Sequence, residues 1–288
     1  MKASAIARII LFSIAILVVG GILIGGLLLY TFAANTDWSK ISQFTDSLIS
    51  VKDGTVTSHG EADPAAVRNL EIDWTSGSVT IIRDQVSQIT FSETPGLDDD
   101  QKMVWKMKGD TLQINYSKFQ LIVGISKSKD LVITVPMDWT LNELEINTVS
   151  ADITVNDLTA REVDICAVDG NCKFTGSSQV EKMEIETVNG DVTFSGSLDK
   201  LKYEAVDADF RAAFTKAPSS LEMGSVNGNF DLKLPHHTGF TAVMNTASGT
   251  FTSVFNTIQN GNRYVAGDGS TYIEIDNVSG NVIINYLE

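Results

Sequence analysis

The chain has 288 residues, a length that permits one large domain or two ordinary ones. Its formal net charge of −15 argues against a nucleic-acid partner, because the phosphates would be repelled. The two cysteines form no Cys-x-x-Cys pair and the three histidines have no metal-ligand spacing, so no zinc site is predicted.

The N-terminal region is predicted to anchor the chain in a membrane. Lys2 and Arg8 precede an uncharged run of 26 residues, 9–34. About 20 apolar residues in a helix cross the hydrocarbon core of a bilayer, so this run is long enough to span it. The charges on either side place residues 1–8 in the cytoplasm and the rest of the chain outside the cell. The alternative is a cleaved signal peptide ending near Ala33, but the apolar region of such peptides is usually shorter.

Two further predictions concern the surroundings of this anchor. Gly21 and Gly25 have the GxxxG spacing that lets two membrane helices approach closely, so this face is a weak candidate for homodimerisation. Residues 36–288 are more acidic than the whole chain, because both basic residues of the first 35 are missing from them. A domain of this charge stays soluble and avoids anionic lipid.

Residues 35–65 are polar and are predicted to be a stalk or an N-terminal cap. Ile41, Phe44 and Leu48 have a loosely helical spacing within this segment. A cap would cover the unpaired backbone groups of the first strand in a stack of repeats.

From residue 66 onward the sequence is predicted to be almost entirely β-structure. The first clear unit is Leu70–Ile81, in which apolar residues alternate with polar ones on both sides of Ser76-Gly77. Four less regular strands are predicted at Gln88–Ser92, Met103–Met107, Thr111–Tyr116 and Leu131–Val135. Asp98–Asp100 is interpreted as a solvated loop, since no ordered ligand spacing supports the alternative of a calcium site.

A repeat of about 20 residues organises the chain between residues 66 and 288. The turn pairs are Ser76-Gly77, Ser150-Ala151, Asp169-Gly170, Asn189-Gly190, Asp207-Ala208, Asn227-Gly228, Ser248-Gly249 and Ser279-Gly280. From Ser150 onward they are spaced by 19, 20, 18, 20, 21 and 31 residues. Such a period is typical of a stacked-repeat fold, so a single-stranded β-solenoid of about eleven rungs is predicted. The last, longer spacing predicts a loop at Asn256–Gly269.

The unit Met183–Phe194 shows how each repeat is expected to work. On its own, Asn189-Gly190 between two alternating runs would predict a β-hairpin. The repeat instead predicts that its strands pair with neighbouring rungs, at Val163–Phe174 and Leu201–Phe210. The outward residues Glu184, Glu186 and Thr193 are then expected to form an exposed surface.

The repeat register also assigns the two cysteines. Cys172 aligns with the core positions Ile153 and Val192, so it is interpreted as a small buried hydrophobe. Cys166 follows the inward-facing Ile165 and is expected to point outward. Residues on opposite faces of a strand cannot be bridged easily, so no disulfide is expected.

Several polar residues are interpreted as structural and not as binding sites. His59 stands alone, and His236 and His237 are interpreted as turn residues. Asn277 begins a glycosylation sequon but occupies an inward-facing position. Acidic and amide side chains are expected to stack along the turns, in two rows: Asp169, Asn189, Asp207 and Asn227, and Asp152, Asn171, Asp191, Asp209 and Asn229. Hydrogen bonds to their own backbone are favoured over a row of cation ligands, since the GGxGxD motif of calcium-binding β-rolls is missing.

No catalytic, cofactor-binding or metal-binding residue is predicted. The sequence contains no nucleophile elbow, HExxH, P-loop or dinucleotide fingerprint. A carbohydrate-active β-helix enzyme is the least favoured alternative, because such an enzyme needs carboxyl groups in a deep cleft and short rungs make a narrow rod.

The segments Asp130–Pro136, Leu144–Val155 and Ile185–Phe194 resemble a bacterial β-strand-repeat family known as "putative adhesin" and as a domain of unknown function. Asp268–Val282 is similar to the closing repeat of that family. The resemblance extends from about residue 66 to the end and implies the fold, with no catalytic residues. Some members are similar to accessory proteins of Gram-positive envelope-stress systems.

The predicted protein is therefore a single-pass membrane protein with an extracellular, all-β solenoid at residues 66–288. Its expected function is that of a non-catalytic, adhesin-like binding module, whose partner is a cell-envelope protein or wall polymer. The alternative from another class is an accessory or regulatory protein of an envelope-stress response.

Overall fold

The computed structural model describes residues 53–117 and 128–288. The predicted anchor at 9–34, its Gly21/Gly25 face, the cytoplasmic residues 1–8 and most of the segment 35–65 lie outside the described residues. In the described ranges every regular element is a strand, and no helix of a length and hydropathy that would cross a membrane is found there. The all-β prediction is confirmed for this part of the chain.

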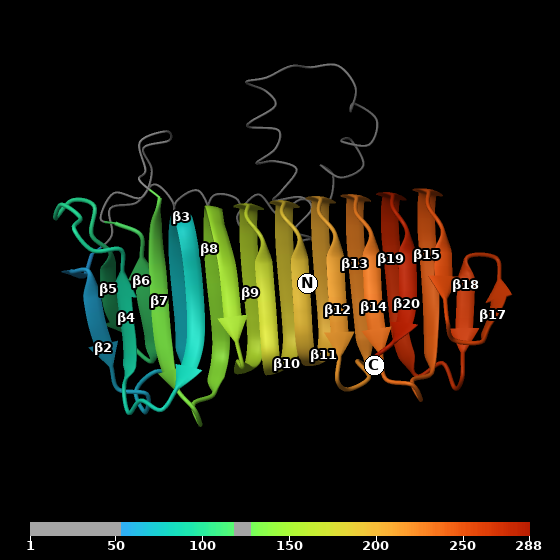
Figure 1. Ribbon diagram of the computed structural model, residues 1–288, viewed down its shortest axis with the longest axis horizontal. Coiled ribbons are helices and arrows are strands. Elements are labelled where there is room, and N and C mark those ends of the chain that lie inside the picture. Colours follow the sequence, from blue (N-terminus) through green and yellow to red (C-terminus); the bar gives the residue numbers. More distant parts are fainter. Residues whose placement is uncertain (1–52, 118–127) are drawn as a thin grey trace, which may run out of the picture.

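Within the described residues, twenty strands form one continuous sheet that coils into a rod (Figure 1). They are β1 (Thr55–Val56), β2 (His59–Ala62), β3 (Asn69–Asp84), β4 (Ile89–Glu93), β5 (Val104–Lys108), β6 (Thr111–Asn115), β7 (Lys129–Pro136), β8 (Leu141–Asn156), β9 (Thr159–Asp169), β10 (Cys172–Asn189), β11 (Val192–Asp207), β12 (Phe210–Phe214), β13 (Ser220–Asn227), β14 (Phe230–Leu234), β15 (Phe240–Ser248), β16 (Phe251–Ser253), β17 (Thr257–Asn260), β18 (Arg263–Ala266), β19 (Thr271–Ser279) and β20 (Val282–Tyr286).

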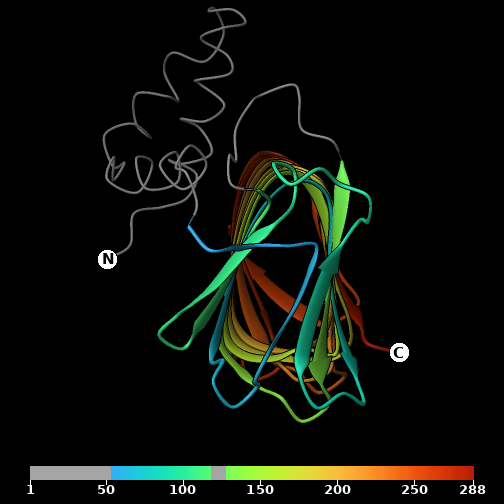
Figure 2. The same ribbon diagram turned by 90° about the vertical axis from the view of Figure 1, so that its left-hand side faces the viewer.

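The rod has two walls of parallel strands, which we call the first and second ladders. The view along the rod shows them facing each other across a flattened interior (Figure 2). In the first ladder the aligned core residues are, in spatial order, Leu112, Leu70, Leu144, Val163, Met183, Leu201, Leu221, Ile273 and Ala242. In the second they are Leu131, Val79, Ile153, Cys172, Val192, Phe210, Phe230, Val282 and Phe251. Each coil of chain contributes one strand to each ladder, which makes nine parallel rungs.

The two corners of each coil line up along the rod as two opposite edges. The turn edge carries the eight turn pairs, which pair with one another in register, as Asn189 does with Asp207. Gly190 shows why small residues recur there. Its φ is +114°, and a Cβ on it would lie 2.2 Å from the carbonyl oxygen of Gly170 on the next rung. The opposite corner, where each coil passes from the second ladder back to the first, is called the groove edge.

The core is the space between the ladders, and it is filled by one residue of every two. Phe174, Phe194 and Phe214 lie one above another on successive rungs, with ring centroids 6.0 and 5.8 Å apart. Each is fully buried. Burying one such side chain contributes about 1.5–3 kcal/mol, so the stacked column is a major source of stability. The predicted pairing of Met183 with Val163 and Leu201, in place of a hairpin, is confirmed.

At the N-terminal end the order of the rungs differs from the order of the sequence. β3 pairs with β8 on one side and with β6 and β7 on the other, so the first long strand is the second rung. Four antiparallel strands then close the end: β5 pairs with β6 and β4 with β7, followed by β1 on β5 and β2 on β4.

The C-terminal end repeats this arrangement. β19 and β20, the last strands of the chain, lie between the β13/β14 rung and the β15/β16 rung. The predicted loop at Asn256–Gly269 is wrong, because β17 and β18 form an antiparallel hairpin whose second strand pairs with β15. The described residues form nine parallel rungs and not the predicted eleven. Strands at both ends pair in antiparallel fashion and so cap the stack instead of extending it.

A buried lysine ties the N-terminal cap together. The Lys129 ammonium lies 2.5 Å from the Glu93 carboxylate and donates to the carbonyl oxygens of Gln101 and Tyr116. It also lies over the rings of Trp74 and Tyr116, 4.8 and 4.2 Å from their centroids. Burial outweighs the bond to Glu93 and lowers the pKa of Lys129 to about 8.

The outward side of the first ladder is less exposed than predicted. Glu184 and Glu186 alternate with core residues as expected, but both are buried, and Thr193 on the second ladder is half-buried. Cys166 lies on this outward side, in register with Glu186, and it too is buried. Cys172 is a core residue in register with Ile153 and Val192, as predicted, and the two cysteines are not joined in a disulfide.

Candidate functional site

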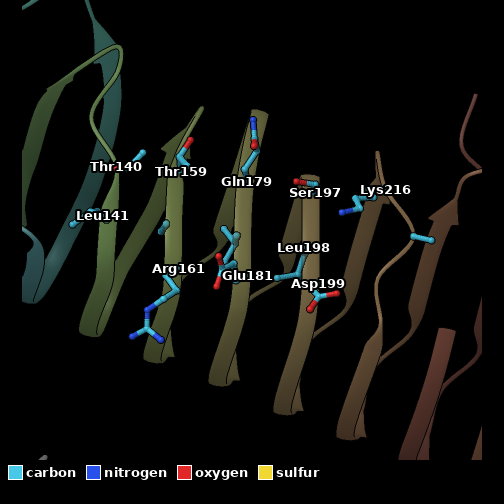
Figure 3. Close-up of a pocket in the computed structure, with 13 residues that line it drawn as sticks. Thr140, Leu141, Thr159, Arg161, Gln179, Glu181, Ser197, Leu198, Asp199 and Lys216 are labelled. Carbon is cyan, nitrogen blue, oxygen red and sulfur yellow. The ribbon is translucent and has the colours of Figure 1, made fainter. Parts of the chain in front are cut away.

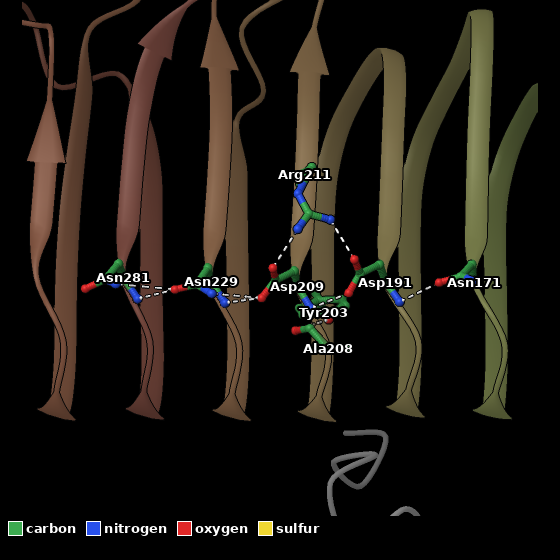
Figure 4. A network of polar contacts seen from close by, with 8 residues as sticks. All are labelled: Asn171, Asp191, Tyr203, Ala208, Asp209, Arg211, Asn229 and Asn281. Carbon is green, nitrogen blue, oxygen red and sulfur yellow. Dashed lines mark hydrogen bonds and ion pairs between the residues drawn. The ribbon is translucent and has the colours of Figure 1, made fainter.

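A ladder of polar side chains runs along the turn edge (Figure 4). The carboxylate of Asp209 accepts hydrogen bonds from the backbone and side-chain nitrogens of Asn229, at 2.8 and 3.0 Å. Asn229 accepts in the same way from the backbone of Asn281, and Asp191 from that of Asp209. The same bond links Asn171 to Asp152, Asp191 to Asn171 and Thr250 to Asn281. Each side chain therefore satisfies the backbone of the neighbouring rung.

Arg211 reinforces this ladder at its centre. Its guanidinium spans two rungs, with 2.7 Å to the carboxylate of Asp191 and 2.6 Å to that of Asp209. Partial burial is the largest single influence on Asp191 and acts to raise its pKa, but the hydrogen bonds from Arg211 and from the backbone of Asp209, together with the charge of Arg211, outweigh it, so the pKa of Asp191 is lowered. The same bond raises the pKa of Arg211.

The structure corrects the predicted role of these turn residues. The prediction is that they accept hydrogen bonds from their own backbone. The side chains of the second row instead accept hydrogen bonds from the backbone of the next rung; these residues are Asp152, Asn171, Asp191, Asp209 and Asn229. The reason is the rung spacing of about 4.8 Å, which brings a side-chain oxygen within reach of the amide above it. Within residues 53–117 and 128–288, no group of three or more His, Cys, Asp or Glu side chains is arranged to hold a metal ion.

Other polar residues that the sequence singled out have partners close by in the structure. His236 stacks on Tyr286, with ring centroids 4.3 Å apart. Asn277 is buried and donates to the carbonyl oxygen of Gly280, in line with its predicted inward position. The exposed Asp99 carboxylate accepts from Lys102 at 2.6 Å, and this bond lowers the pKa of Asp99.

A concave surface lies on the groove edge, where it extends over five rungs (Figure 3). This groove has a volume of about 350 Å³. Its floor is a column of buried side chains that are aligned in the strand register: Leu141, Ala160, Val180 and Leu198. Figure 3 shows the polar side chains that stand on both sides of this floor. The groove therefore runs along the rod, across the strands.

The two rims of the groove differ in chemistry. One rim is a row of neutral groups, Thr140, Thr159, Gln179 and Ser197. The other carries the charged groups Arg161, Glu181 and Asp199, and Lys216 lies at the end of the groove. Asn142 accepts a hydrogen bond of 2.7 Å from Arg161 Nε and so holds that guanidinium in place. Behind this rim Lys182 contacts Glu162 at 2.5 Å, and this hydrogen bond raises the pKa of Lys182.

Sequence reasoning did not find this groove. In the alternating pattern of the repeat, Val180 occupies an ordinary core position, and its neighbours Gln179 and Glu181 occupy ordinary surface positions. The signal that could have been used is the recurrence of a neutral polar residue, an apolar residue and a charged residue at the repeat spacing, as in Thr159–Arg161, Gln179–Glu181 and Ser197–Asp199.

The fold and these two edges define a class of protein, a capped β-solenoid with a polar ladder on one edge and a groove on the other. The chain belongs to the Toastrack DUF4097 family, whose profile matches residues 67–198 and 139–285. The resemblance seen in the sequence is thereby confirmed. No curated protein gives a significant match to the chain.

Three crystal structures illustrate the likeness to solved proteins. A "putative adhesin" of Bacteroides fragilis is 15% identical, with 82% of this chain and 99% of that chain covered and a TM-score of 0.48. A "putative cell adhesion protein" of Clostridium sporogenes is 13% identical, with coverages of 79% and 97% and a TM-score of 0.38. A "putative lipid binding protein" of Parabacteroides distasonis is 11% identical, with coverages of 80% and 96% and a TM-score of 0.36. With TM-scores below 0.5, these likenesses carry no functional argument.

Proposed function

We propose that this protein is a membrane-anchored, extracellular and non-catalytic binding module that holds an extended polymer of the cell envelope in its groove. Residues 9–34 would supply the anchor, and the rod would present the groove outside the cell. The observation that carries the proposal is the groove itself, which runs lengthwise over five consecutive rungs.

The repetition of the groove suits a ligand that also repeats. Rungs follow one another at about 4.8 Å, and each adds a polar group to one or both rims. A linear chain lying along the rod would meet a similar set of groups at every rung, as Gln179 follows Thr159 and is followed by Ser197. A compact small molecule would use only a fraction of these positions. The geometry therefore favours a polymer over a metabolite.

The charges on the rim favour a polymer that is polar but not strongly charged. Arg161 and Lys216 offset Glu181 and Asp199 within the groove, although the chain as a whole is strongly acidic. A polyanion would be repelled by the rest of the rod, and a polycation would be drawn to the turn edge instead. Hydroxyl and amide groups on the other rim can donate and accept hydrogen bonds. We therefore propose the glycan strands of the cell wall as the ligand class.

The placement of the carboxylates supports a binding role over a catalytic one. Glycosidases hold two carboxyl groups on opposite sides of the bond that they cleave. Glu181 and Asp199 lie on the same rim of the groove, on adjacent rungs (Figure 3), so neither faces the other across a bound chain. An enzyme would show turnover on a panel of glycans that is lost on replacing Glu181 or Asp199, and such turnover would refute the non-catalytic role.

Co-sedimentation of the full chain with purified, insoluble peptidoglycan tests the proposal. Gln179→Trp would place a large ring on the exposed rim and obstruct the groove, and we expect the affinity to fall at least tenfold. Gln259→Trp is the matched control, because Gln259 is an exposed residue of β17, in the antiparallel hairpin at the C-terminal end of the rod and away from the rungs that line the groove. Equal binding by both variants, or no binding by the unmodified chain, would contradict the proposal.

A role as an accessory of an envelope-stress system is the alternative. Adjacent genes for a sensor kinase or another membrane regulator, together with a chain that binds no wall polymer, would favour it over the binding module.

A further inference from the structure

The last strand of the first ladder at the C-terminal end of the rod, β17, has an open edge. Within the described residues β17 pairs with β18 alone, and β18 in turn pairs with β15 (Figure 1). The last strand of the second ladder, β16, has three residues, and Tyr264 of the hairpin stacks on its Phe251 with ring centroids 3.9 Å apart. The open edge of β17 presents a row of backbone N–H and C=O groups, which can bind a further strand.

The register of the hairpin identifies the backbone groups on this edge. The carbonyl oxygen of Asn262 accepts a hydrogen bond of 2.9 Å from the backbone of Met244 on β15, so the even-numbered residues from Asn262 onward are bonded to β15. The odd-numbered residues of β18 therefore bond to β17, where their partners include Ile258. Thr257 and Gln259 alternate with these partners, so their N–H and C=O groups point to the open edge.

This end of the rod carries no charge. Residues 238–262, which contain β15, β16 and β17, include no Asp, Glu, Lys, Arg or His, although 20% of the whole chain is charged. Ile258 is 77% exposed on the outward face, beside Val265 of β18. Proteins commonly protect an exposed edge strand with charged residues or proline. β17 has neither.

The N-terminal end of the rod is protected in this way. Its outermost described strands are β1, which has two residues, and β2, which carries the exposed Glu61. Asp63 and Pro64 follow β2 directly. Short, charged edges of this kind disfavour pairing with another strand. The two ends of the described rod therefore differ, and the C-terminal end is the one that suits a partner strand.

A second copy of the same chain fits this edge in both charge and geometry. Two chains of net charge −15 repel each other, and contact between their uncharged ends keeps the charges apart. A twofold axis through Ile258 sets β17 antiparallel to its copy, so that Thr257 and Gln259 of one copy exchange backbone hydrogen bonds with Gln259 and Thr257 of the other. The two Ile258 side chains then meet on the outward face, where each covers the exposed surface of the other.

We propose that the protein forms a twofold dimer by antiparallel pairing of β17 with β17 of a second copy, centred on Ile258. Both copies use the same edge, so the pairing closes on itself and gives a dimer instead of a filament. Four residues of each copy make a contact that is small for a protein interface, so the dimer is weak and forms at high local concentration. The groove lies on other rungs, so it stays open in both copies.

A cysteine at position 258 tests the register of the pairing. The Cα atoms of such a facing pair are about 4.5 Å apart, which is within the range that a disulfide spans. We expect Ile258→Cys in the full chain to form a disulfide-linked dimer under mild oxidation, detected by non-reducing electrophoresis. Ile283→Cys is the matched control, because Ile283 is 39% exposed on β20, which is paired with β14 on one side and β16 on the other. The unmodified chain, whose Cys166 and Cys172 are buried, should not crosslink.

Sedimentation velocity over a range of concentrations measures the association itself. Ile258→Lys places a charge on the edge and should weaken dimerisation at least tenfold, whereas Ile283→Lys should leave it unchanged. The pairing uses the backbone of Gln259 and not its side chain, so Gln259→Trp should dimerise like the unmodified chain.

Oxidation of a mixture of Ile258→Cys and Glu61→Cys chains distinguishes head-to-tail pairing, which would join positions 258 and 61. That mixed crosslink as the main product would overturn the proposal. Crosslinking of Ile258→Cys no greater than that of Ile283→Cys, or equal dimerisation of the two lysine variants, would also overturn it. None of these readouts involves wall polymer, so their failure is distinct from failure of the proposed function.

Discussion

Replacing Lys129 with methionine tests how far the N-terminal cap depends on a buried ion pair. The side chains of Lys129 and Glu93 are 1% and 0% exposed, and their charged groups are 2.5 Å apart. Methionine keeps the unbranched shape of the lysine stem and its packing against Trp74, but it removes the charge and three hydrogen bonds. The Glu93 carboxylate would remain buried and would keep the hydrogen bond of 2.8 Å from the backbone amide of Met103.

The expected cost follows from this one-sided loss. Removing one partner of a buried pair typically destabilises a protein by about 3–5 kcal/mol, because the remaining charge is uncompensated. Replacing both partners by neutral groups costs much less, since no charge is then left in the core. Lys129→Met should therefore lower the free energy of unfolding by about 3–5 kcal/mol, and adding Glu93→Gln should recover about half of that or more.

Urea denaturation of the full chain, followed by tryptophan fluorescence, measures these differences. The series contains the unmodified chain, both single variants and the double variant, so that the coupling between the two positions is obtained directly. Lys173→Met is the matched control, because Lys173 is exposed on the second ladder and its loss should cost less than about 0.5 kcal/mol. A cost below about 1 kcal/mol for Lys129→Met, or a double variant as unstable as the sum of the singles, would refute this reasoning.

Three other outcomes are expected. Phe194→Ala should cost about 3–5 kcal/mol in urea denaturation, because the ring is stacked between two others, whereas the outward Thr193→Ala should cost little. Burial lowers the pKa of Lys129 to about 8, below its unfolded value, so the unfolded chain binds more protons between about pH 8 and 10; stability relative to Lys129→Arg should rise across that window. Asp209→Ala should lower the thermal midpoint and cost about 1–2 kcal/mol, since it removes the carboxylate that accepts hydrogen bonds from Asn229 on the next rung, and the exposed Asp207→Ala should not.

The repeat register was predictable because it depends only on local alternation. Cys172 could be placed opposite Ile153 and Val192 by counting residues from the turn pairs, and the structure has this register. A shift by one residue would turn a whole core column toward water, so only one alignment of neighbouring rungs is stable. The same counting placed Met183 against Val163 and Leu201.

The properties of the edges were only partly predictable. The stacking of Asp191 and Asp209 followed from the repeat, but their acceptance of hydrogen bonds from the next rung depends on the distance between rungs. The groove could not be predicted, because its shape depends on how the backbone runs at five successive corners of the rod. The sequence of a single repeat does not reveal that path. The burial of Glu186 was missed for a related reason: alternation tells which side of a strand a residue is on, and not whether that side is covered.

The sequence by itself determined that this chain forms an all-β rod with a period near 20 residues, and it assigned most residues to the core or the outward side. Only the tertiary structure decided the order of the rungs at both ends. At the N-terminal end β3 is stacked between the β6/β7 rung and β8, and at the C-terminal end the β19/β20 rung is stacked between the β13/β14 and β15/β16 rungs. The physical reason is that all rungs present similar alternating strands, so the local pattern allows several neighbours. The choice among them depends on which arrangement lets antiparallel strands cap both ends of the stack.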